Sequence, residues 1–186
     1  LLIFDFNGIL RWKSEIKEHT YSVHILPPSI DPKYEGFIAV GSEKKLTIFS
    51  GIGEKLLEYK SNNPQDRNQK VSNSTTSNPF YKVLFPEALA KSKLNQNLLP
   101  IIIGTWDYFY LLECSLSTSE RKISSAKVVW RYRTNGSVSK ILIPEETPMT
   151  HGQTYSSDPT IDSSLLVAST NDFYLLNIDG KAVWKI

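Results

Sequence analysis

The chain has 186 residues, enough for one domain with a substantial core, and its 40% hydrophobic and 22% charged residues are typical of a globular protein. A formal net charge of +2 gives no electrostatic reason to expect nucleic acid or an anionic membrane as a partner. No apolar run approaches the length that spans a bilayer, so we expect no direct membrane insertion.

The chain opens, over residues 1–16, with two short apolar strands joined by an Asn7-Gly8 turn, and Trp12 lies in the second strand. Glycine favours such a turn because it adopts positive φ without a Cβ clash. Residues 21–60 contain four further short strands, separated by proline, glycine and polar turn signals. Residues 61–79 are polar and low in complexity, which predicts a mobile surface loop.

The third group of strands occupies residues 80–133 and contains the one segment, residues 87–99, where we expect a helical turn or two. The fourth group occupies residues 138–186. It contains a second polar loop and ends with three strands, the last two of which turn at Asp179-Gly180.

An internal repeat links these groups. Residues 101–112 match residues 165–176 at a shift of 64 positions, and residues 41–49 match the first of these segments at a shift of 63. Two strands followed by three groups of four antiparallel strands are typical of β-propeller blades enlarged by loop insertions. The sequence therefore predicts an all-β fold. We expect a single partial β-propeller of about three and a half blades, with a blade remnant at 1–16 and blades at roughly 21–60, 80–133 and 138–186.

The segment from Asp179 to Trp184 reads Asp-Gly-Lys-Ala-Val-Trp and resembles the end of a PQQ-like (quinoprotein-type) β-propeller repeat, which also places the chain near WD40-like propellers. The segments around Gly8 and before Trp130 resemble it in part, whereas Leu57 takes the tryptophan position after Gly53. The resemblance implies that one tryptophan per motif packs between neighbouring blades. Large aromatic rings suit that gap. The residues concerned are Trp12, Trp130 and Trp184.

Three and a half blades do not close a ring, and blades bury their faces against one another. We therefore expect two open apolar faces that a protein partner or the remaining blades of the same polypeptide would cover.

Catalytic chemistry finds little support in the sequence. The resemblance implies that an enzymatic, quinoprotein-dehydrogenase relative would pair adjacent cysteines against its cofactor and bind calcium, but Cys114 is the single cysteine. Its leucine-rich surroundings predict a buried strand residue rather than a nucleophile. We interpret His151, Asp158 and Asp162 as solvated loop residues and His19 and His24 as ordinary residues at a strand, and we expect no catalytic, cofactor or metal site.

Trp106, Tyr108 and Tyr110 cluster at a turn and the following strand. They are interpreted either as packing between blades or as a partner-binding patch, because exposed aromatic side chains are good interface anchors. Asn73 and Asn135 fit the N-glycosylation pattern and would be modified only if the chain enters a secretory route.

Three functions remain open at this point. The first is a non-catalytic propeller scaffold that mediates protein–protein interaction or complex assembly, presenting loops on rigid blades. The second is a fragment of a quinoprotein-type oxidoreductase whose cofactor residues lie in other blades. The third is a glycosylated cell-surface adhesion propeller.

Overall fold

A computed structural model describes residues 1–30, 34–60, 79–117, 122–143, 164–177 and 179–186. This part of the chain contains fourteen strands and one helix. In chain order they are β1 (Leu2–Phe4), β2 (Leu10–Lys13), β3 (Thr20–Leu26), β4 (Phe37–Ser42), β5 (Leu46–Ser50), β6 (Lys55–Tyr59), β7 (Lys82–Leu84), α1 (Glu87–Leu94), β8 (Leu98–Gly104), β9 (Tyr108–Leu116), β10 (Ile123–Arg133), β11 (Val138–Leu142), β12 (Ser164–Ser169), β13 (Phe173–Asn177) and β14 (Ala182–Lys185).

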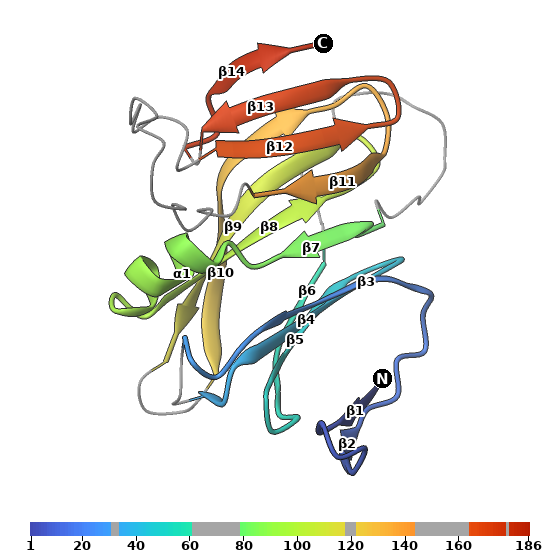
Figure 1. Cartoon of the computed structure of the whole chain (residues 1–186), viewed down its shortest axis with the longest axis vertical. Coiled ribbons are helices and arrows are strands. Elements are labelled where there is room, and N and C mark those ends of the chain that lie inside the picture. The colour runs from blue at the N-terminus through green and yellow to red at the C-terminus, as the bar shows by residue number, and fades with distance from the viewer. Residues whose placement is uncertain (31–33, 61–78, 118–121, 144–163, 178) are drawn as a thin grey trace, which may run out of the picture.

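The strands form one two-stranded sheet and three four-stranded antiparallel sheets. We call them blade I (β1–β2), blade II (β3–β6), blade III (β7–β10) and blade IV (β11–β14). Within each sheet the strands pair in sequence order. Figure 1 shows the blades stacked in chain order, from the blue hairpin of blade I to the red sheet of blade IV. The predicted all-β, propeller-like architecture of a remnant and three four-stranded blades is confirmed.

The core lies between blades because the middle strands of each four-stranded sheet are predominantly apolar. Every residue of β4 and β5 is buried, as expected of strands covered on both faces. One core cluster joins blades II and III, and a second joins blades III and IV. A smaller cluster joins blade I to blade II through Ile3 and Trp12. Each blade is therefore held by its neighbours in the stack.

The turn between the second and third strand has the same structure in blades II, III and IV. The backbone N–H groups of Ser42, Thr105 and Ser169 donate to the carbonyl three residues later, at 2.9, 2.7 and 2.8 Å. Each hydroxyl accepts the backbone N–H of that later residue. These are the positions that the internal repeat aligns, so the repeat in the sequence is a repeat in the structure.

The predicted helical segment is present as α1, which connects β7 to β8 and buries Ala90. Its Lys91 and Lys93 lie in the last turn, where cations favour the helix dipole. The predicted loop over 61–79 lies outside the described residues except for Pro79.

Candidate functional site

Trp12 packs at the contact between blades I and II. We call such a contact between two neighbouring blades a joint. Its indole Nε1 donates to the carbonyl of Gly51 at 2.8 Å, and its ring lies 5.5 Å from the ring of Phe49. Gly53 follows at φ +91°, and a Cβ there would come within 2.7 Å of the indole carbon Cδ2. The indole therefore occupies the space that any other residue at Gly53 would need.

Trp130 makes an equivalent joint between blades III and IV. Gly180 has φ +80°, and a Cβ there would lie 2.5 Å from Cδ2 of Trp130. The ring of Trp130 also meets Phe109 edge-on at 5.9 Å. Each tryptophan thus packs on the outer turn of the blade that follows it.

The joint between blades II and III has neither the tryptophan nor the glycine of the other two joints. Leu57 replaces the tryptophan, and the following outer connection, residues 117–122, has no glycine in its sequence. There Tyr34 donates its hydroxyl to the carbonyl of Ser117 at 3.0 Å instead. Tryptophan and glycine are therefore present together at two joints and absent together at the third.

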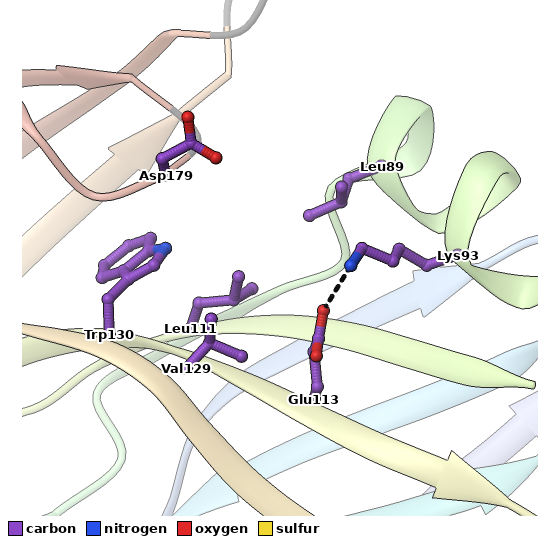
Figure 2. Close-up of a pocket in the computed structure, with 7 residues that line it drawn as sticks. All are labelled: Leu89, Lys93, Leu111, Glu113, Val129, Trp130 and Asp179. Carbon is purple, nitrogen blue, oxygen red and sulfur yellow. Dashed lines mark ion pairs between the residues drawn. The ribbon is translucent and has the colours of Figure 1, made fainter. Parts of the chain in front are cut away.

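A pocket of about 180 Å³ opens beside the joint of blades III and IV. Figure 2 shows the indole of Trp130, the ion pair between Lys93 and Glu113 at 2.9 Å, and Asp179 on the outer turn of blade IV. Ligand pockets usually enclose roughly 300–1,000 Å³, so this one is small for an organic substrate. The charges of Lys93 and Glu113 already neutralise each other, and we interpret the pocket as a packing gap of the joint.

The three aromatic residues singled out from the sequence do not share one surface. Trp106 is 53% exposed, on the turn between β8 and β9. Tyr108 lies under the guanidinium of Arg131, 4.1 Å from its ring centroid. Tyr110 is buried in the core between blades II and III, so it packs between blades and is not available to a partner.

Trp106 instead joins two tyrosines from other parts of the chain. The Trp106 ring lies 6.0 Å from that of Tyr81, and the Tyr81 ring lies 5.0 Å from that of Tyr21 on β3. Exposed Val23 and Ile25 continue along the same side of β3, because alternate residues of a strand share a face. We call Tyr21, Tyr81 and Trp106 the aromatic rim. Sequence spacing alone could not connect these residues, since packing of blade II on blade III brings Tyr21 to Tyr81, and pairing of β7 with β8 brings Tyr81 to Trp106.

Cys114 and His24 both lie in hydrophobic surroundings. Cys114 is fully buried, and burial raises the pKa of its thiol to about 12. His24 accepts the backbone N–H of Phe85 at its Nδ1, at 3.3 Å. Burial lowers the pKa of His24, and the negative charge of Glu87 opposes that shift. Both side chains therefore lie at the contact between blades II and III.

The remaining candidates are placed as follows. His151, Asp158, Asp162 and Asn73 lie outside the described residues. Among the residues that are described, no group of three histidine, cysteine or acidic side chains is arranged to hold a metal ion. Asn135 is exposed, and its carbonyl accepts the side-chain amide of Asn171 at 2.6 Å. In the same described part, no helix is both long and apolar enough to cross a membrane.

No protein-family model and no curated protein matches the sequence. A crystal structure of Sqt1 from Saccharomyces cerevisiae, a WD40 β-propeller protein, matches 99% of this chain with a TM-score of 0.62 at 14% sequence identity. The chain spans 41% of the length of that Sqt1 chain. At this identity the likeness shows the fold alone, which is that of part of a β-propeller.

Proposed function

We propose that this chain is a non-catalytic propeller scaffold that binds a protein partner through the aromatic rim of Tyr21, Tyr81 and Trp106. The observation that carries the proposal is the exposed ring of Trp106, which lies in a row with Tyr81 of the same blade and Tyr21 of blade II. Tryptophan and tyrosine are the residues that most often anchor protein interfaces.

The surroundings of the rim support this function. The exposed Val23 and Ile25 of β3 extend the rim into a contiguous apolar surface, and such surfaces on soluble proteins often mark interaction sites. The two blades that carry the rim are joined by the core cluster between blades II and III, which supports the aromatic rings. Because these rings are already held in place, a partner that binds them loses little side-chain conformational entropy at this surface.

The non-catalytic part of the proposal is supported by the single cysteine. A thiolate is the nucleophilic form of cysteine, and burial keeps Cys114 protonated and out of contact with solvent. The likeness to a WD40 propeller supports a scaffold fold and carries no partner over to this chain.

Quantitative affinity capture would test the proposal, with the wild-type chain compared against Trp106→Ala and a matched control. Ile52→Ala serves as the control because Ile52 is also an exposed large apolar residue but lies on the outer turn of blade II, away from the rim. We expect a defined protein to be lost with Trp106→Ala and retained with Ile52→Ala. If no captured protein depends on Trp106, the aromatic rim is not a partner site.

A further inference from the structure

The turn between β10 and β11 carries an Asn-Gly dipeptide at the joint of blades III and IV. The sequence contains this dipeptide twice, as Asn135-Gly136 and as Asn7-Gly8, and both asparagines are exposed. An Asn-Gly pair can modify itself, because the backbone nitrogen of the glycine can attack the side-chain carbonyl carbon of the asparagine. Glycine has no Cβ to obstruct this approach. The two dipeptides differ in the structure at the attacking nitrogen.

At the hairpin of blade I the attacking nitrogen is engaged. The N–H of Gly8 donates to the carbonyl of Asp5 at 3.0 Å, and the N–H of Asn7 donates to Oδ1 of Asp5 at 2.9 Å. Gly8 would have to break its hydrogen bond before it could react. In the described part of the chain, by contrast, the N–H of Gly136 donates to no other group. Its nitrogen is therefore available without the loss of a backbone hydrogen bond.

The Asn135 turn is also part of the joint between blades III and IV. The backbone N–H of Asn135 donates to the hydroxyl of Tyr174 at 3.3 Å, and its carbonyl accepts Nδ2 of Asn171 at 2.6 Å. The hydroxyl of Tyr174 in turn donates to Oδ2 of Asp172 at 2.7 Å. Hydrogen bonds from Tyr174, from Lys185 and from the side chain of Asn135 hold the pKa of Asp172 below its ordinary value. Asn135 of blade III thus contacts blade IV with its backbone and its side chain.

We propose that Asn135 is a site of spontaneous deamidation, and that this modification loosens the joint between blades III and IV. In the first step a bond forms between the nitrogen of Gly136, which loses its proton, and Cγ of Asn135. The Cγ–Nδ2 bond breaks, and ammonia leaves. Water then opens the resulting succinimide ring and gives aspartate or isoaspartate at position 135. The reaction consumes one water, releases one ammonia and needs no oxidant or reductant.

Either product changes the contacts across the joint. Aspartate places a carboxylate where the amide of Asn135 donates to Asp172, so two like charges face each other. Isoaspartate also adds a methylene group to the main chain. It therefore shifts the N–H that donates to Tyr174 relative to the carbonyl that accepts from Asn171. This site is separate from the aromatic rim and goes beyond the proposed function.

The first test compares the deamidation rates of the two dipeptides in the full chain, made in a host that adds no glycans. Peptide mapping by mass spectrometry follows the replacement of –NH₂ by –OH during incubation at mildly alkaline pH. The same rates in denaturant give the ratio that neighbouring residues alone produce. In the folded chain we expect the ratio of Asn135 to Asn7 to exceed that baseline by about threefold to tenfold, the factor by which one backbone hydrogen bond that must break slows a reaction.

The second test uses substitutions that represent the product and block the reaction. Asn135→Asp should increase amide hydrogen exchange in residues 164–177 of blade IV. Asn7→Asp is the matched control, because it adds the same charge at the other exposed Asn-Gly turn, and it should leave this exchange unchanged. Asn135→Gln keeps the amide but would have to form a larger ring to react. We expect incubation to increase exchange in blade IV of the wild-type chain and not in Asn135→Gln.

Three results would overturn the proposal. A ratio in the folded chain no larger than that in denaturant would show that the fold does not select Asn135. Equal exchange in residues 164–177 of Asn135→Asp and the wild-type chain would show that the modification does not loosen the joint. An incubated Asn135→Gln chain that loosens as much as the incubated wild-type chain would place the responsible change at another residue.

Discussion

At the scale of single residues, the joints depend on glycine for two reasons. Gly53 and Gly180 adopt positive φ, which side chains with a Cβ disfavour, and each also leaves room for an indole from the preceding blade. Gly8 shares the backbone conformation but has open space around it. Substitutions at the three turns can therefore distinguish the energetic cost of positive φ from the cost of steric overlap with an indole.

We predict that Gly180→Ala lowers the free energy of unfolding by clearly more than Gly8→Ala does. Both substitutions place alanine at positive φ, at a cost of about 1–2 kcal/mol. Only Gly180→Ala also drives a methyl group into the ring of Trp130, which adds about 1–3 kcal/mol. Denaturant unfolding in dilute solution measures both values, and equal losses would contradict the prediction.

At the scale of elements, His24 connects strand β3 to blade III. Its Nδ1 accepts the N–H of Phe85, and its ring lies 5.9 Å from that of Phe85. A protonated imidazole could not accept this bond. The contact between β3 and the chain after β7 therefore requires the neutral form of His24.

We predict that the protein loses stability as the pH falls below about 6.5, the ordinary pKa of histidine, in part because of His24. Burial lowers the pKa of His24 in the folded chain, so the unfolded chain takes up the proton first and is favoured as acidity increases. His24→Asn offers an uncharged acceptor and should reduce the slope of unfolding free energy against pH.

The control for that experiment is His19→Asn, since the side chain of His19 is exposed. It should leave the slope close to that of the wild-type chain. Identical slopes for the wild-type chain and His24→Asn would show that His24 does not contribute to the acid sensitivity.

At the scale of the whole molecule, the stack resembles a repeat protein in which each unit is stabilised by its neighbours. Blade I has only two strands and is attached to blade II through a small cluster that includes Trp12. Blade IV is attached to blade III through a larger cluster, against which Trp130 packs. Damage at one joint should therefore stay near that joint.

We predict that Trp12→Ala increases amide hydrogen exchange in residues 1–16 and leaves blade IV nearly unchanged. Trp130→Ala is the matched variant and should increase exchange in residues 164–186 while sparing the hairpin of blade I. Hydrogen exchange followed by mass spectrometry resolves these segments. Loss of protection along the whole chain with either variant would show that the stack unfolds as a single unit.

The sequence by itself determined the local units of this protein. Short apolar runs, glycine turns and the alignment of Thr105 with Ser169 were enough to predict fourteen strands in one remnant and three blades, because strand and turn propensities act over a few residues. The helical segment that became α1 was predicted on the same local grounds.

Only the tertiary structure decided which side chains meet. Tyr110 is buried and Trp106 exposed, although they are four residues apart, because blade II covers one and not the other. Tyr21 meets Tyr81 because blade II packs on blade III, and Tyr81 meets Trp106 because β7 pairs with β8. Trp12, Trp130 and Trp184 share one motif, yet Trp184 differs in exposure, because burial at a joint depends on the next blade and not on the residue's own strand.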